Sequence, residues 1–256
     1  MLLVLIKSLF GGLDMQVKIN DYFFEFHGAQ KVFFGDFERE LRKLKFDEKF
    51  KIIYITDPPY NINYNYDKHD DDLSPLDYEM MLREIPSPRV IIHYPEPTIN
   101  ILPQAFNQRC EKVAQWIYNA NTLRNHRTVS WWGCNPDFNR VKQPYKDPND
   151  KRIKERIKNG SKGARSYDWF NINQVKNVSK EKTNHPCQIP IKVFERIIKL
   201  TIDENEYNDY IVIDPFAGSG SSGMACKNLG IKYIGFDISY DYTEIANKRM
   251  EVKGYD

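Results

Sequence analysis

The stretch that decides the fold is IVIDPFAGSGSSG, residues 211–223, in which an apolar run meets an acid and then a series of glycines. The apolar start predicts a buried strand, and residues 221–229 predict a helix that ends at Gly230, a common residue just past a helix C-terminus. Glycines between them permit backbone angles and close approaches that side chains prevent. A strand, a glycine turn and a helix in this order predict an anion-binding corner of a Rossmann-like sheet.

Strands and helices alternate along the rest of the chain, which predicts an α/β fold with a mixed, mostly parallel sheet and ligands at the strand carboxyl ends. Strands are expected at 31–34, 51–56, 89–93, 210–213 and 232–236, and helices at 37–44, from 190 onward, at 221–229 and at 242–250. At 111–118 and 128–132 the apolar pattern does not distinguish strand from helix.

The glycine turn is compatible with two cofactors. Gly218-x-Gly220-x-x-Gly223 matches the dinucleotide fingerprint, so a nicotinamide dehydrogenase is one interpretation. The acid at Asp214 favours another, because it would lie close to an anionic pyrophosphate but would suit the amino group and sulfonium of S-adenosylmethionine. Asp237 ends the next strand, where its carboxylate could accept hydrogen bonds from ribose hydroxyls.

A second corner, Asp57-Pro58-Pro59-Tyr60, directly follows the strand expected at 51–56 and therefore lies at the same edge of the sheet. Asp57 supplies a carboxylate acceptor, the Pro58 carbonyl is a second acceptor held rigid by the following proline, and Tyr60 offers a flat face. These groups together would bind an exocyclic amino group on a planar ring. The alternative is a polyproline turn with a packed tyrosine.

Composition excludes several classes of protein. The 256 residues are 41% hydrophobic and 28% charged, and the 35 aromatic side chains need a core, so the chain is not disordered as a whole. No apolar run reaches the ~18–20 residues of a membrane span. Four cysteines without a C-x-x-C pair favour a reduced, cytoplasmic protein. Residues 1–14 are expected to be an N-terminal extension, and residues 68–72, KHDDD, a solvated loop rather than a metal site.

Basic residues are concentrated in one segment. Residues 121–183 contain 15 Lys or Arg and 6 Asp or Glu, a net charge of +9, whereas the remainder carries −7. Such a local excess is typical of a surface that faces a polyanion, although an exposed lysine-rich helix beside core aromatics is the alternative. The densest run is 151–158, KRIKERIK. Residues that could stack on bases or wedge between them lie nearby: Trp131, Trp132, Phe138, Asn139, Tyr145, Tyr167, Trp169 and Phe170.

In the identity and order of these motifs, the chain resembles the β class of DNA amino-methyltransferases, which methylate adenine N6 or cytosine N4 with S-adenosylmethionine. Residues 57–60 come first, a variable target-recognition region follows, and the cofactor glycine turn comes last. The best-matched stretches are 57–60, 184–199 and 211–249. Ser221-Ser222 stands where the family usually has Thr-Thr, a change that keeps both hydroxyls, whereas residues 67–108 match poorly.

The resemblance implies a reaction and its site residues. An adenine flipped out of double-stranded DNA would donate its amino N–H groups to Asp57 and the Pro58 carbonyl and stack on Tyr60. Adenine is the expected target because an Asp begins the motif, where cytosine-modifying relatives more often have Ser. The implied catalytic residues are Asp57, Pro58, Pro59 and Tyr60. The implied residues for S-adenosylmethionine are Asp36, Asp214, Pro215, Phe216, Gly218, Ser219, Gly220 and Asp237.

The resemblance also divides the chain into functional parts. These are the extension 1–14, a catalytic part at 15–120, a basic target-recognition insertion at 121–183 and a cofactor-binding part at 184–256 of the same domain. No metal and no membrane are expected, and a restriction endonuclease partner and a homodimer are both compatible with the family. The alternatives are a cytosine-N4 DNA methyltransferase, an RNA methyltransferase, a NAD-dependent dehydrogenase and a non-catalytic DNA-binding relative.

Overall fold

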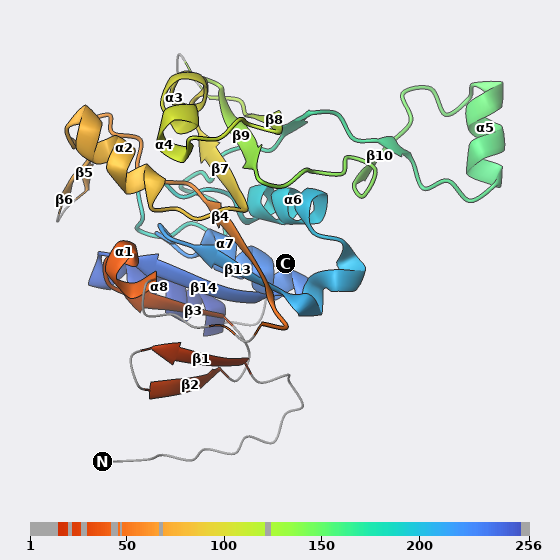
Figure 1. Cartoon of the computed structure of the whole chain (residues 1–256). Coiled ribbons are helices and arrows are strands. Elements are labelled where there is room, and N and C mark those ends of the chain that lie inside the picture. Colours follow the sequence, from red (N-terminus) through yellow and green to blue (C-terminus); the bar gives the residue numbers. More distant parts are fainter. Residues whose placement is uncertain are drawn as a thin grey trace.

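The structure is a computed structural model that describes residues 15–19, 22–26, 30–41, 46, 48–66, 69–120 and 124–251 (Figure 1). The extension expected at 1–14 lies outside these residues. Within them, no helix combines the length and the apolar character needed to cross a membrane.

An eight-stranded sheet runs through the molecule in the order β12-β8-β9-β7-β4-β13-β14-β3. Its strands pair in parallel, except that β9 runs antiparallel to both of its neighbours, β7 and β8. The strands are β3 (Gln30–Phe34), β4 (Lys51–Thr56), β7 (Arg89–His93), β8 (Lys112–Ile117), β9 (His126–Trp132), β12 (Trp169–Asn171), β13 (Tyr210–Asp214) and β14 (Lys232–Asp237). The two segments that the apolar pattern left open, 111–118 and 128–132, therefore form strands.

Helices cover both faces of this sheet. Successive residues of a strand point to opposite faces, so in β4 Ile53 and Ile55 join one buried cluster and Tyr54 joins the other. The first cluster packs under α6 (Ile191–Thr201), α7 (Ser221–Leu229) and α8 (Tyr240–Glu251). The second packs under α1 (Phe37–Leu41), α2 (Pro75–Arg83) and α4 (Leu102–Phe106), and α3 (Pro95–Asn100) precedes α4. The predicted α/β fold with a mostly parallel sheet is confirmed.

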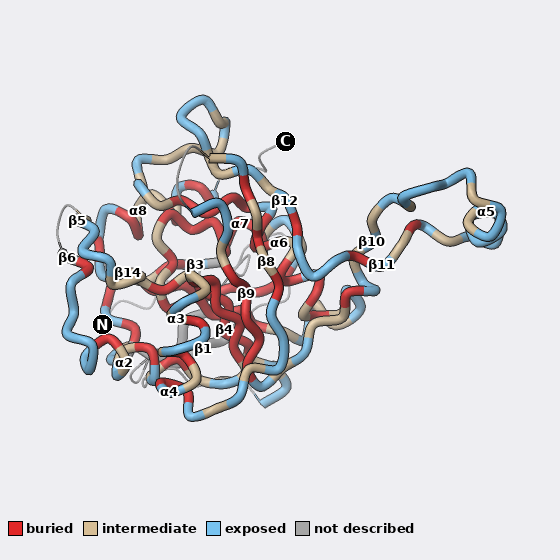
Figure 2. Tube along the Cα trace, turned by 90° about the horizontal axis from the view of Figure 1, so that it is seen from above, coloured by how far each residue is buried: buried red, intermediate tan, exposed pale blue. Residues whose placement is uncertain are grey.

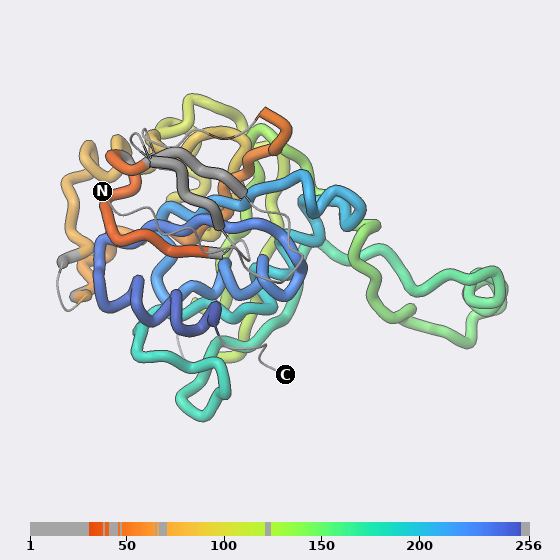
Figure 3. The backbone as a smooth tube through the Cα atoms, turned by 90° about the horizontal axis from the view of Figure 1, so that it is seen from below, coloured from red at the N-terminus to blue at the C-terminus, as the bar shows by residue number. Residues whose placement is uncertain are grey.

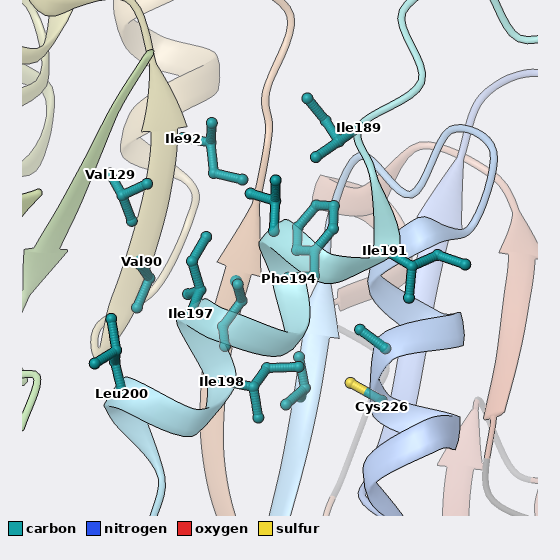
Figure 4. Close-up of a cluster of buried hydrophobic side chains, with 14 of the residues drawn as sticks. Val90, Ile92, Val129, Ile189, Ile191, Phe194, Ile197, Ile198, Leu200 and Cys226 are labelled. Atoms are coloured by element: carbon teal, nitrogen blue, oxygen red, sulfur yellow. The ribbon is translucent and has the colours of Figure 1, made fainter. Parts of the chain in front are cut away.

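Helix α6 shows what holds the first cluster together. Its apolar side chains face the sheet and α7, among them Phe194, Ile197 and Ile198 (Figure 4). Each fully buried side chain of this size contributes roughly 1.5–3 kcal/mol to stability. The expected one-sided pattern from residue 190 onward is thus confirmed, and this packing fixes the helix beside the strand that carries Asp214.

Short elements complete the fold. They are the hairpin β1 (Met15–Ile19) and β2 (Tyr22–Phe26), the pair β5 (Asn65–Tyr66) and β6 (His69–Asp70), the pair β10 (Lys142–Gln143) and β11 (Ala164–Arg165), helix α5 (Lys151–Lys158) and the 3₁₀ helix η1 (Glu204–Asp209). Residues 142–165, which include β10, α5 and β11, project from the body, and we call them the arm (Figure 2).

The segment 121–183 is therefore not one separate unit. It contributes β9 and β12 to the main sheet, and the arm lies between these two strands in the sequence. The expectation that all of its aromatic residues could stack on bases is wrong for Trp131, Trp132, Phe138 and Phe170, which are at most 4% exposed. Their apolar spacing serves the core of the sheet instead. Tyr167 and Trp169 are 48% and 45% exposed and stack on each other.

Candidate active site

Four strands of the sheet end in, or are soon followed by, an aspartate at the same edge. Asp36 follows β3, Asp57 follows β4, and Asp214 and Asp237 end β13 and β14. A cavity of about 380 Å³ opens between these strand ends, within the size range of small-molecule sites. It is lined by every expected site residue except Gly220: Asp36, Asp57, Pro58, Pro59, Tyr60, Asp214, Pro215, Phe216, Gly218, Ser219 and Asp237. The structure thus joins the two corners that the sequence placed 157 positions apart.

Gly220 has a role in the packing of two helices. It precedes α7 with a φ of 76°, and a Cβ at this position would lie 2.7 Å from the Cβ of Ala246 in α8. The glycine is therefore required by the close packing of α7 against α8. Gly220 is not among the residues that line the cavity, so its part in cofactor binding stays a prediction.

The turn at Gly218 is fixed from two sides. Its N–H donates to Oδ2 of Asp237 at 2.9 Å, and the N–H of Ser239 donates to Oδ1 of the same carboxylate at 2.8 Å. With a φ of +51°, Gly218 occupies the left-handed region, and a Cβ there would lie 2.9 Å from Nε2 of His185. The glycine therefore leaves bare backbone at the cavity wall.

Asp214 braces the same turn from below. Its buried carboxylate accepts hydrogen bonds from Oγ1 of Thr56 and Oγ of Ser222, both at 2.5 Å, and from the N–H of Phe216 at 3.0 Å. Burial raises the pKa of Asp214 to about 6, although these hydrogen bonds oppose the increase. The main role of Asp214 is therefore to hold the loop in shape, and its negative charge in the cavity is a smaller contribution. Ser221-Ser222 keeps the hydroxyls of the family's usual Thr-Thr. The hydroxyl of Ser222 is one of these, and it donates to Asp214.

At the other corner, Asp57 is held by two donors. The Tyr60 hydroxyl donates to Oδ1, and Nη1 of Arg127 lies 3.5 Å from Oδ2. Burial raises the pKa of Asp57 to about 6, and both Arg127 and Tyr60 act against this increase. The carboxylate is therefore oriented before any ligand arrives.

The ring of Tyr60 is already packed in this structure. It stacks on His93, with ring centroids 4.4 Å apart, and meets the edge of Tyr94 at 4.6 Å. The guanidinium carbon of Arg127 lies 4.9 Å from the Tyr60 centroid. A base that stacks on Tyr60 must therefore share the ring with Arg127 or displace its guanidinium.

A hydrogen-bonded chain fixes the proline turn. The N–H of Tyr94 donates to Nδ1 of His93 at 2.7 Å, so the remaining ring proton of the neutral imidazole is on Nε2, which lies 2.5 Å from the Tyr78 hydroxyl. That hydroxyl donates in turn to the Pro59 carbonyl at 2.9 Å. Burial lowers the pKa of His93 to about 3, which keeps the imidazole neutral. The Pro59 carbonyl therefore already accepts a hydrogen bond from the protein, and this bond helps to fix the proline turn.

Several residues that line the cavity, and His93, which packs beneath Tyr60 behind its wall, were not predicted as site residues. Arg127 lies at the start of β9, and that start reaches the cavity edge only because β9 is antiparallel. The apolar pattern did not show the direction of this strand, so no signal pointed to Arg127. His93 directly ends the expected strand 89–93, and its position there was an available signal. Tyr66 and Cys187 also line the cavity, from segments without regular patterning.

The charges around the cavity favour a cationic ligand. Five carboxyl groups line it, those of Asp36, Asp57, Asp71, Asp214 and Asp237, together with the single guanidinium of Arg127. A pyrophosphate would meet repulsion there, whereas an ammonium or sulfonium group would be attracted. Among the described residues, no group of His, Cys, Asp and Glu side chains is arranged to hold a metal ion.

Comparison with protein families and curated proteins matches this chain to methyltransferases. A family model described as DNA methylase matches residues 89–248, a range that begins after the Asp57–Tyr60 corner. The type II methyltransferase M.HpaI of Haemophilus parainfluenzae is 28% identical over 230 residues, which cover 80% of this chain and 70% of that protein. Further curated relatives are matched over 26–49% of their own length.

Solved structures share the fold. The M1.HpyAVI–SAM complex superposes with a TM-score of 0.53 at 23% identity and covers 86% of this chain and 98% of that one. The cytosine-N4-specific PvuII DNA methyltransferase superposes with a TM-score of 0.61 at 15% identity, over 89% and 88% of the two chains. The overall fold of this chain is therefore shared with these methyltransferase structures.

Proposed function

Because the chain belongs to the N6/N4 DNA methylase family, we propose that it transfers a methyl group from S-adenosylmethionine to the exocyclic amino group, N6, of an adenine in double-stranded DNA. The observation that supports this proposal best is the shared cavity, which brings the Asp57–Tyr60 corner and the glycine turn to one site. Membership of the family also decides between the two interpretations of the glycine turn, against a NAD-dependent dehydrogenase.

The residues present fit the methyl donor. Gly218 leaves backbone exposed where a Cβ would collide with His185, and the carboxylates of Asp36 and Asp237 stand at the ends of neighbouring strands. Phe216 and Phe37, with ring centroids 5.0 Å apart, offer an apolar wall beside them. We assign these residues to cofactor binding, and the donor, when bound, supplies an activated methyl group on a cationic sulfur.

Asp57 and the Pro58 carbonyl are the proposed acceptors for the target amino group. The nitrogen lone pair is delocalised into the ring, so the free amino group is a poor nucleophile. Acceptors on both N–H bonds draw the nitrogen toward a tetrahedral shape, in which its lone pair would be available to the activated methyl group. The Asp57 carboxylate, which accepts one of these N–H bonds, would take up the proton that the methylated nitrogen then releases. Such preorganised positioning and charge stabilisation account for several kcal/mol of barrier lowering in enzymes, on the order of 3–4 for one group.

Internal hydrogen bonds support this use of the turn. Tyr78 engages the Pro59 carbonyl, and His93 packs under the Tyr60 ring. The rigid turn therefore presents its two proposed acceptors, the Asp57 carboxylate and the Pro58 carbonyl, without changing shape. This rigidity lowers the entropic cost of binding the amino group. An Asp at the head of the motif supports adenine over cytosine as the target. A cytosine-N4 enzyme is the second candidate.

The basic residues of 121–183 are the proposed DNA contacts, and they fall into two places. The arm follows β9 in the chain, and β9 ends at the edge of the sheet opposite the cavity. Figures 1 and 3 show the arm on the other side of the body from α1. After β12 the chain returns to the cavity edge with Lys176, Lys180 and Lys182. We therefore assign phosphate contacts near the flipped base to the returning segment and more distant contacts with the duplex to the arm.

The test is incubation with a labelled methyl donor, once with mixed-sequence double-stranded DNA and once with RNA, followed by nucleoside analysis. The proposal expects label in N6-methyladenine from DNA. Label in N4-methylcytosine would overturn the choice of base, label in RNA alone would overturn the choice of substrate, and DNA binding without label would indicate a non-catalytic relative. Sedimentation with and without DNA tests whether the chain forms a homodimer, and protection of methylated DNA from a cognate endonuclease tests for a restriction partner.

A further inference from the structure

We propose that Arg127 is a positioning residue for the transfer reaction, whose guanidinium keeps the Asp57 carboxylate ionised and turned toward the cavity. The purpose of this arrangement rests on the proposed function, because an ionised carboxylate is what accepts an amino N–H. The arrangement itself is a property of the protein alone and can be measured without DNA or cofactor.

Arg127 reaches Asp57 through the topology of the sheet. Strand β9 is separated from β4 by β7 and runs antiparallel to both, so its first residues lie where β4 and β7 end. The guanidinium and the carboxylate are 3.5 Å apart, and their side chains are 11% and 16% exposed. A pair this sheltered from water is screened far less than one on the surface, so its charges interact strongly.

The surroundings of Arg127 show that its place is specific. Its guanidinium carbon lies 4.9 Å from the centroid of Tyr60, 5.4 Å from Trp116 and 5.8 Å from Tyr94, so three aromatic rings surround the cation. Its Nε has no hydrogen-bond partner among the described residues. A guanidinium with an unsatisfied N–H is costly to bury unless a charge partner compensates, and Asp57 is the carboxylate within ion-pair distance.

Asp57 in turn depends on this one cation. Six groups from the packed elements interact with its carboxyl group: Tyr60, Tyr66, Tyr78, Arg127, Cys187 and Asp214. Of these, only Arg127 is positively charged at neutral pH, and Asp214 is a second acid. Without Arg127, the buried Asp57 carboxyl would retain a proton at neutral pH and would present an O–H to the amino group in place of a second acceptor.

The alternative is that Arg127 only fills space between the aromatic rings. A charge-keeping substitution separates the two roles, because Arg127→Lys retains the cation but loses the flat guanidinium, whereas Arg127→Met fills similar space without charge. If the charge is what matters, Lys rescues and Met does not. If packing is what matters, the methionine variant is the better of the two.

The experiment is a ¹³C NMR titration of aspartate carboxyl carbons in the full chain without DNA, with Asp57→Asn identifying the Asp57 signal. We expect an Asp57 midpoint near pH 6 in the wild type and in Arg127→Lys, and a midpoint about 1–3 pH units higher in Arg127→Met. An unchanged midpoint in Arg127→Met would overturn the proposal. A wild-type Asp57 midpoint above neutral pH would also overturn it. This second test uses the wild-type protein alone, so it does not depend on whether the Arg127 variants fold.

Kinetics give the second readout. The acidic limb of the pH–kcat profile follows ionisation of Asp57, so in Arg127→Met it moves to higher pH while KM for DNA changes little, and Arg127→Lys restores it. A titration shift without methyl transfer by any of the proteins contradicts the proposed function and leaves the role of Arg127 intact. Methyl transfer with an acidic limb that Arg127→Met does not move contradicts the role of Arg127 alone.

Discussion

The cavity edge of the sheet and the arm both concentrate charge, but they hold it in opposite ways. At the cavity, Asp57 and Asp214 are sheltered from water and each accepts hydrogen bonds from defined donors. On α5, none of the eight residues is buried, and the side chain of Arg152 beside Asp150 is 90% exposed. Sheltered charges have shifted pKa values and fixed directions, whereas exposed charges interact weakly and are screened by salt.

This difference separates two kinds of function. A site that positions one amino group needs few charges in defined places, because geometry decides the rate. A surface that attracts a polyanion needs many charges and little geometry, because each contact adds a sequence-independent contribution. Changes at the cavity edge should therefore alter methyl transfer or cofactor binding, whereas changes in the arm should alter only the binding of DNA.

The largest effect is expected for Asp57→Ala. Loss of the carboxylate removes an acceptor that acts on the reacting nitrogen, so the rate of methyl transfer falls by about 10²–10³-fold or more. Cofactor affinity, measured by calorimetry, changes little because Gly218 and Asp237 are untouched. The matched control is Asp150→Ala in the arm, which removes the N-cap of α5 and leaves the transfer rate unchanged. Methylation at the normal rate by Asp57→Ala would refute the assignment.

Next is Tyr78→Phe, which removes one buried hydroxyl and leaves the Pro59 carbonyl and the His93 N–H without their partner. Thermal unfolding should show a loss of about 1–3 kcal/mol, and transfer should slow because the turn is less rigid. Tyr145→Phe deletes a hydroxyl that pairs with Ser161 in the arm and should change neither stability of the body nor transfer. Equal effects of the two variants would show that the hydroxyl at position 78 is not special.

A smaller effect is expected for Gly218→Ala. The new Cβ must occupy the left-handed region 2.9 Å from His185, at a cost of about 1–2 kcal/mol. If the free turn relaxes to relieve this cost and the donor needs the original shape, binding must restore the strain, and affinity for S-adenosylmethionine should fall about 5- to 30-fold by calorimetry. Gly230→Ala is the control, because it has a φ of 73° and open space around its Cβ, at the far end of α7. It should lower stability without changing cofactor affinity; a matched loss of affinity would contradict the role of Gly218.

The smallest effect is expected in the arm. Lys154→Gln with Lys158→Gln removes two exposed charges of α5 and should weaken DNA binding at all sequences alike. The slope of log affinity against log salt should fall by about two. Lys31→Gln with Lys248→Gln removes two exposed charges at the other end of the sheet and should leave the slope unchanged. A slope that does not change in the α5 variant would exclude the arm from the DNA contact.

The sequence predicted the cavity well because strand ends are easy to recognise. An apolar run that stops at Asp57-Pro58 or Asp214-Pro215 identifies both the strand and the edge where it ends. Arg127 could not be predicted, because its approach to Asp57 depends on the direction of β9 and on the order of strands, which only the fold determines. Net charge indicated a polyanion surface in 121–183 but could not show that part of this segment belongs to the sheet.

The central claim is that a methyl donor and a target amino group meet in one cavity between Asp57 and Gly218. A crystal structure of the full chain with S-adenosylmethionine tests it most directly. We expect the donor to contact the turn at Phe216 and Gly218 and the carboxylate of Asp237, with its sulfonium methyl directed at Asp57 and Pro58. A donor bound away from this turn, or with its methyl group directed away from Asp57, would show that the two corners do not form one active site.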